Sequence, residues 1–270
     1  MLYNKKNKWI YTVLVRTVFI VIILCIWEYI AKQNIFGNQS ELIFPSLETI
    51  GEAFIRNFLK GYAGLSLWIY IGNSMKLLIQ GLVIGIFLSF LLSGLSMISK
   101  NFYYIYTLVV SICDLLPGVA LLPIIIIIFG IKPEVIVLLV VHAVLWPMSR
   151  SILDGFLAVP KIYVEAGMNI GLKGLTLLWG VYLPAAMSYI LSGLKVGWAR
   201  AWRGLISAEM IFGIATCPGI GLFINQMRTN MNNAEMYATL IVIIIIGLVV
   251  QYGILVPIEN YTIKKWGMSK

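Results

Sequence analysis

The chain carries little charge. Only 11% of its 270 residues are Asp, Glu, Lys or Arg, whereas 60% are hydrophobic. Soluble domains have about 25% charged and about 45–50% apolar residues, so this composition argues against one and indicates lipid as the solvent. About 20 apolar residues cross a hydrocarbon core of about 30 Å. The chain therefore has room for about half a dozen membrane spans and little else.

Residues for metal and nucleophile chemistry are also scarce. The single histidine, His142, lies in an apolar run, which excludes a histidine-based metal cluster. Cys25, Cys113 and Cys217 include no C-x-x-C pair, so they support neither a disulfide framework nor a zinc site. The sequence has no G-x-x-x-x-G-K-S/T, G-x-S-x-G or H-E-x-x-H motif. We therefore expect no cofactor in this chain and no intramembrane enzyme.

Residues 1–64 are expected to form a membrane helix and an external helix. The basic residues of segment 5–8 precede an apolar run over 9–31, which is too long for a signal peptide and lacks a cleavage pattern. Pro45 and Ser46 then start an amphipathic helix on the outer surface. Its apolar positions are Leu47, Ile50, Ala53, Phe54 and Phe58, opposite Glu48, Glu52 and Arg56.

Residues 65–257 are expected to form the transmembrane core, and 258–270 a basic cytoplasmic tail. The further spans are predicted at about 65–97, 102–130, 134–153, 178–212 and 236–257. Proline frees a carbonyl and commonly marks a bend in a membrane helix. Bends are therefore expected at Pro117, Pro123, Pro147 and Pro184.

The basic residues support a topology with both termini in the cytoplasm. The net charge of +9 reflects positive-inside topology and contact with anionic lipid, so nucleic acid is not an expected partner. This topology places nine lysines inside, namely Lys5, Lys6, Lys8, Lys100, Lys161, Lys173, Lys264, Lys265 and Lys270. The outside set is Lys32, Arg56, Lys60, Lys132 and Arg228. The segment 165–184 then lies in the cytoplasm.

This cytoplasmic segment, EAGMNIGLKGLTLLWGVYLP, resembles the signature loop of ABC importer permeases. The family pattern is Glu-Ala-Ala, three residues, Gly, nine residues, Ile, one residue, Leu-Pro. The matching residues are Glu165, Ala166, Gly171, Leu183 and Pro184. Gly167 replaces an alanine, and Val181 replaces an isoleucine. Segments 42–50, 72–96, 115–131 and 191–210 resemble the nitrate/sulfonate/taurine-type subfamily, although Lys76 stands where arginine is common.

The resemblance implies an all-α, polytopic membrane protein with about six transmembrane helices and the type I ABC importer (MetI-like) permease fold. It implies a bacterial inner or plasma membrane location and import of a small anionic or heterocyclic nutrient, such as a sulfonate, nitrate or taurine. The implied partners are a second copy of this chain, two ATPase subunits holding ATP and Mg, and a solute-binding (lipo)protein.

Local physics agrees with a coupling helix at about 160–174. Pro160 is tolerated at a first helical position, and Gly171 and Gly174 accept the left-handed conformation that ends a helix. Glu165 would offer a charge to a basic residue of the ATPase. Ala166 and Gly167 would keep one face slim enough for close approach.

Ionisable residues inside membrane helices are costly and mark functional candidates. Asp114, just before Pro117, either lines the pathway or pairs with a basic group. His142 is expected to be a hydrogen-bonded interior residue rather than a proton relay.

The fifth span carries Lys195, Arg200, Arg203 and Glu209. The three cations lie on neighbouring faces of a helix, where they would attract an anionic solute. Alternatively, the arginines pair with Asp114 and Glu209 or reach the outer headgroups. The segment 215–236 is expected to be a polar external loop that a solute-binding protein touches.

Two other function classes remain as alternatives. A secondary transporter would use an ion gradient and would typically show internal repeats with broken helices at matching positions. We find no convincing repeat. A channel subunit would need no coupling loop, so the segment 165–184 favours the importer.

Overall fold

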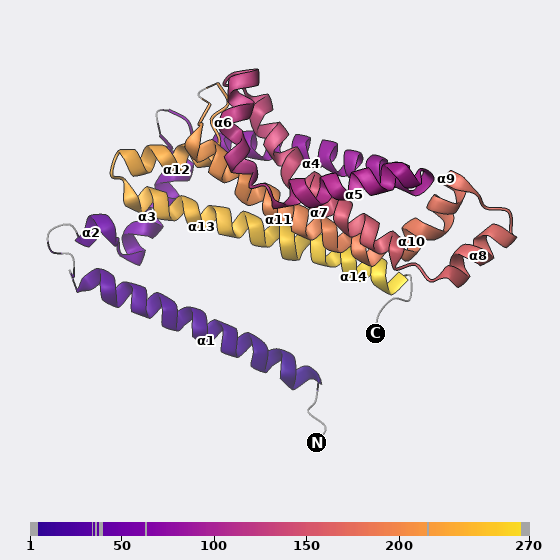
Figure 1. Cartoon of the computed structure of the whole chain (residues 1–270). Coiled ribbons are helices and arrows are strands. Elements are labelled where there is room, and N and C mark those ends of the chain that lie inside the picture. The colour runs from indigo at the N-terminus through magenta and orange to yellow at the C-terminus, as the bar shows by residue number, and fades with distance from the viewer. Residues whose placement is uncertain are drawn as a thin grey trace. The chain divides into compact units, whose positions relative to one another are not determined.

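The structure, a computed structural model, describes residues 5–33, 35, 37, 40–62, 64–214 and 216–265, with side chains from residue 10 to 262. These residues form two compact units, 1–67 with 224–242 and 68–223 with 243–270. Figure 1 shows the chain as helices throughout. In the described ranges an isolated bridge between Tyr62 and Leu65 is the sole β-type pairing. The all-α prediction is confirmed.

The helices have the lengths that a membrane requires. Four are long and apolar enough to span one, namely Ile10–Lys32, Leu67–Ile98, Pro133–Leu157 and Asn233–Thr262. Two bent pairs, Lys100–Leu115 with Gly118–Phe129 and Gly174–Ala185 with Met187–Ile211, bring the number to six if each pair is one span. The predicted number of about six is therefore confirmed. The side chains of Lys5, Lys6, Lys8, Lys264 and Lys265, and the whole of Lys270, lie outside the described residues.

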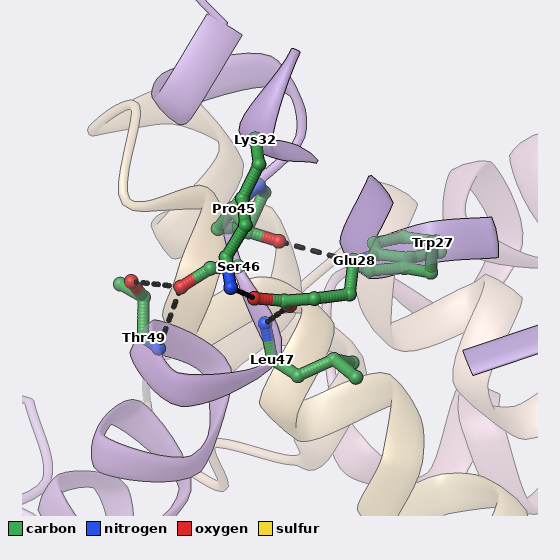
Figure 2. A network of polar contacts seen from close by, with 7 residues as sticks. All are labelled: Trp27, Glu28, Lys32, Pro45, Ser46, Leu47 and Thr49. Carbon is green, nitrogen blue, oxygen red and sulfur yellow. Dashed lines mark hydrogen bonds and ion pairs between the residues drawn. The ribbon is translucent and has the colours of Figure 1, made fainter. Parts of the chain in front are cut away.

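The first unit contains α1 (Lys5–Lys32), α2 (Ser40–Ile43) and α3 (Leu47–Leu59). Ser46 caps α3 by accepting the Thr49 N–H at 3.2 Å, which confirms the predicted start. Glu28 of α1 accepts the Leu47 N–H at 2.9 Å (Figure 2). The Trp27 indole donates to the Pro45 carbonyl at 3.0 Å. Two of the four orphan N–H groups of α3 are thus satisfied by side chains.

The buried face of α3 packs against α13 (Asn233–Val250). Ile50 and Ala53 contact Ala238, as the amphipathic pattern predicts. Asn57 lies on the same face, 2% exposed, and donates to the Glu235 carbonyl at 3.1 Å. This polar group within the buried face was not expected from the pattern. The position of α3 relative to the membrane stays a prediction.

The second unit is built around α7 (Pro133–Leu157), the most buried of the spans. Its neighbours include α4 (Leu67–Ile98) and α11 (Met187–Ile211). Val144 of α7 is fully buried and faces Gly85 of α4 and Gly197 of α11. A Cβ atom added at Gly85 would lie 3.1 Å from the Val144 side chain, and one added at Gly197 would lie 3.4 Å from it. Small residues let membrane helices approach closely. These contacts hold α4, α7 and α11 together.

Two of the four predicted proline bends are present. The chain bends by 100° between α5 (Lys100–Leu115) and α6 (Gly118–Phe129), at Pro117. It bends by 74° between α10 (Leu183–Ala185), which contains Pro184, and α11. Pro123 and Pro147 lie inside α6 and α7, which continue through them without a break, so the bends expected at these two residues stay predictions.

Two π-helical segments precede prolines. They are η2 (Leu178–Tyr182), before Pro184, and η3 (Gln251–Leu255), before Pro257 of α14 (Val256–Lys265). Proline has no N–H, and its ring meets the carbonyl four residues earlier, so the wider π turn relieves that conflict. The residue four before each proline is glycine, Gly180 or Gly253.

The segment 215–236 is not a simple polar loop. It contains α12 (Ile220–Thr229), and Ile220, Phe223 and Met227 on that helix are 1% exposed or less. The prediction of an external loop is wrong in this respect. Apolar residues at three- and four-residue spacing between polar ones explain the helix.

Candidate functional site

The predicted coupling helix is present as α8 (Lys161–Asn169), between α7 and α9 (Gly174–Leu177). Pro160 is its N-cap. It ends in a paired motif, because the Leu172 N–H donates to the Gly167 carbonyl at 3.0 Å and the Gly171 N–H donates to the Met168 carbonyl at 2.9 Å. Gly171 has φ +88°, the left-handed conformation predicted for a helix stop.

The exposed face of α8 carries Glu165 and Ala166. In the described part of the chain the Glu165 carboxylate makes no ion pair, which leaves it open to a partner. Gly167 is buried instead, and a Cβ there would lie 2.8 Å from Val181 and 2.9 Å from Leu177. The prediction that Gly167 slims the partner-facing side is therefore wrong. It lets α8 pack closely on α9 and η2.

A groove of about 720 Å³ lies between α8 and the segment that leads into α11. Tyr163 and Ala166 line its α8 side, and Val181 and Pro184 line the other side. Leu183 is buried at 8% exposure. The six predicted loop residues thus have three roles. Glu165 and Ala166 are exposed, Gly171 ends the helix, and Gly167, Leu183 and Pro184 pack against the rest of the unit.

A second site is the break cavity, which we define as the space of about 280 Å³ at the bend between α5 and α6. Its lining includes five of the seven predicted pathway residues, namely Asp114, Pro117, His142, Arg200 and Arg203. Figure 1 shows α6 and α8 at opposite ends of the second unit. The linings of the groove and of the break cavity share no residue, so the predicted residues form two separate groups.

Asp114 is the centre of an ion-pair cluster. Its Oδ1 accepts from Nη1 of Arg200 at 2.5 Å, and its Oδ2 accepts from Nε of Arg150 at 3.2 Å. The predicted pairing of Asp114 with a basic group is confirmed. Arg150 was not among the residues predicted for this site, although it lies within the predicted span 134–153. A charged residue directly after a long apolar run is uncommon, and this feature of the sequence could have identified Arg150 as a candidate.

His142 and Trp146 line the same cavity, and their rings lie 6.0 Å apart. The His142 Nε2 and Trp146 Nε1 atoms are buried and have no hydrogen-bond partner among the described residues. The prediction that His142 is a hydrogen-bonded interior residue is therefore wrong for Nε2.

Three predicted pathway residues have other surroundings than expected. Lys195 pairs with Glu259 of α14, away from the cavity. Glu209 accepts from the Ser74 hydroxyl and the Gly221 N–H, and Arg203 donates to the Ala199 carbonyl. Within the described ranges neither Arg203 nor Glu209 forms an ion pair, so the predicted pairing is wrong for both. That Arg203 reaches the outer headgroups stays a prediction. The described ranges also hold no group of three His, Cys, Asp or Glu side chains arranged for a metal.

Membrane-length helices around a charged cavity, with a short exposed helix between two spans, are the arrangement expected of a polytopic permease. Comparison with known proteins agrees. Residues 81–256 match the family described as "Binding-protein-dependent transport system inner membrane component", which is more than half of the chain. The chain belongs to this family. It is the permease component of a binding-protein-dependent transport system in a membrane, and not itself an enzyme.

Three similar proteins support the family assignment. The taurine transport system permease protein TauC of Escherichia coli (strain K12) is 24% identical over 236 residues, covering 87% of this chain and 84% of TauC. The nitrate import permease protein NrtB of Synechocystis sp. is 27% identical over 257 residues, 91% and 89% of the two chains. A probable ABC transporter permease protein of Haemophilus influenzae is 24% identical over 233 residues, 86% and 90%. The resemblance inferred from the motif is confirmed.

Proposed function

We propose that this chain forms the translocation pathway of an ATP-driven importer for a small nutrient and is driven through α8. The cargo is anionic or heterocyclic, of the sulfonate, nitrate or taurine kind. The observation that carries the coupling assignment is α8 itself, a short helix between two spans with an exposed carboxylate at Glu165. The names of the taurine and nitrate relatives support the class of cargo.

The complete importer would contain two copies of this permease, two ATPase subunits and a solute-binding protein. ATP and Mg would bind to the ATPase subunits, since the permease sequence lacks a phosphate-binding loop. Both termini and α8 would face the cytoplasm of a bacterial cell. Transport would proceed by rigid-body rocking of the two permeases about their shared interface.

The packing of α8 supplies a route for the coupling movement. Gly167 allows α8 to sit directly on Val181 of η2, and η2 continues through Pro184 towards α11. Because packed elements move together, a displacement of α8 by the ATPase is passed to α11. That helix carries Arg200 and Arg203, which line the break cavity.

Uncoupling variants test this function. Glu165→Ala removes the charge offered to the ATPase, and Gly171→Val forces a branched side chain into φ +88°. Both variants are expected to insert normally and to retain most of the ATPase activity of the complex. They should lose about 90% or more of uptake in proteoliposomes, a tenfold change that corresponds to roughly 1.4 kcal/mol in a rate barrier. Lys161→Ala, an exposed change on the same helix, is the matched control and should transport normally.

Normal uptake in both Glu165→Ala and Gly171→Val would contradict the assignment of α8. Co-purification separates the importer from a gradient-driven transporter or a channel. The detergent-extracted permease should bring an ATPase subunit with it, and consistent purification without one would contradict the importer.

A further inference from the structure

The break cavity has an excess of positive charge. Arg150, Arg200 and Arg203 stand at or beside it, whereas Asp114 is the one carboxylate of the described residues within 4.0 Å of any of their guanidinium groups. The Asp114 side chain is only 12% exposed. Uncompensated charge is costly in a membrane protein, so the cavity favours a second anion.

Hydrogen-bond donors in the cavity wall point to the same ligand class. Gly118 and Val119 line the cavity at the beginning of α6, whose N-cap, Pro117, makes no side-chain hydrogen bond. The first N–H groups of a helix have no partner within it and carry partial positive charge. The Trp146 indole N–H also lacks a partner in the described part of the chain. Oxyanions satisfy such donors.

We propose that the break cavity is an oxyanion site whose counter-ion in the empty permease is Asp114, and that an entering sulfonate, nitrate or carboxylate group replaces Asp114 at Arg200. The cavity volume of about 280 Å³ admits a molecule of a few non-hydrogen atoms beside the guanidinium. Arginine suits the exchange, because its planar fork accepts one bidentate oxyanion as readily as another.

The exchange would link solute binding to helix movement. Asp114 is the last acidic residue of α5, and Arg200 is on α11, so their ion pair ties these helices together. An anion that takes over Arg200 releases this tie and leaves Asp114 with Arg150 of α7. This inference rests on the proposed function, since it assumes that the cargo carries an oxyanion.

Anion titration of the purified, full-length permease in detergent tests the exchange. The probes are sodium nitrate, sodium methanesulfonate and taurine in a constant sodium chloride background, which contains no competing oxyanion, measured by calorimetry. Asp114→Asn removes the internal competitor and should tighten binding of at least one probe by about tenfold or more. Arg200→Gln removes the receiving fork and should weaken that binding by about tenfold or more. Arg228→Gln removes an exposed arginine on α12 and should leave binding unchanged.

A double variant separates binding from folding. If Arg200→Gln alone leaves Asp114 without a partner and the protein unfolds, Asp114→Asn with Arg200→Gln removes both charges and restores the fold. Binding should remain lost in this double variant. Recovered binding would show that Arg200 only balances Asp114, and it would overturn the proposal. Unchanged or weaker binding in Asp114→Asn would overturn it as well.

Two further measurements distinguish a solute from a lipid headgroup as the bound anion, and failure of the proposed exchange from failure of the proposed function. Added phosphatidylglycerol should not compete with the probe, whereas full competition would assign the site to a lipid headgroup and overturn a solute site. ATP-driven anion uptake by the complete complex tests the proposed function separately. If the complex takes up the anion but Asp114→Asn does not tighten binding, the exchange alone is rejected. If Asp114→Asn tightens binding but the complex takes up no anion, the proposed cargo is rejected.

Discussion

Glu209 is a carboxylate held by hydrogen bonds rather than by a cation. It is 1% exposed, and its oxygens accept the Ser74 hydroxyl at 2.8 and 2.9 Å and the Gly221 N–H at 2.9 Å. The Ser74 oxygen in turn accepts the Ile220 N–H at 2.8 Å. The pair therefore holds the first turn of α12 against α4 and α11. A buried carboxylate is tolerated where donors converge on it in this way.

Replacing Glu209 should destabilise the permease in proportion to the acceptors removed. Glu209→Leu leaves buried donors without an acceptor and is expected to lower the free energy of unfolding by about 3 kcal/mol. Glu209→Gln keeps one acceptor and should lower it by about 1 kcal/mol. Unfolding in detergent, followed by tryptophan fluorescence, gives both values. Equal losses in the two variants would contradict the hydrogen-bond role.

At the scale of single elements, three helices begin or end at residues whose local chemistry favours that boundary. Ser46 starts α3, Ser99 starts α5 by accepting the Phe102 N–H at 3.3 Å, and Gly171 ends α8. These signals act within three or four residues, so they do not depend on distant packing. Proline by itself does not decide where a helix breaks, because Pro117 lies at a break whereas Pro147 lies inside a continuous helix.

Removal of the Ser46 cap should loosen the start of α3. Ser46→Ala loses the hydrogen bond to the Thr49 N–H and should cost about 1 kcal/mol of local stability. Hydrogen exchange of the residue 44–59 region should therefore accelerate by about fivefold. Glu52→Ala, an exposed change on the same helix, is the control. Equal exchange in the two variants would argue that Glu28 alone secures this end.

At the scale of the whole molecule, lipid takes the place of a second layer of protein. The candidate span of α1 has none of its residues buried within the chain, and large apolar side chains such as Phe19 are exposed along it. In water such a surface would aggregate, whereas in a bilayer it needs no cover. The buried α7 carries the packing of the second unit instead.

Thiol labelling tests the proposed topology. In a background with Cys25, Cys113 and Cys217 replaced by serine, cysteines are placed at exposed Lys173 and exposed Met231. A membrane-impermeant maleimide should modify Lys173→Cys in inside-out vesicles alone and Met231→Cys in right-side-out vesicles alone. The reverse pattern would place α8 outside the cytoplasm and remove the basis for coupling.

Much of the candidate coupling site was predictable because its residues are neighbours in the chain. The motif Glu165–Pro184 identified the family, and the glycine and proline positions located α8 within a few residues. The orientation of Gly167 was not predictable. It depends on where Leu177 and Val181 return to the helix, which is a matter of packing.

The sequence by itself determined the solvent, the helical class, the family and the ends of α3 and α8, because composition, periodicity and capping act over short stretches of chain. The tertiary structure alone decided which charges meet. Asp114 lies 36 residues from Arg150 and 86 from Arg200, and Glu209 lies 135 residues from Ser74. No local pattern encodes such pairs. They exist because close packing of α7 and α11, and the bend at Pro117, bring these side chains to one place.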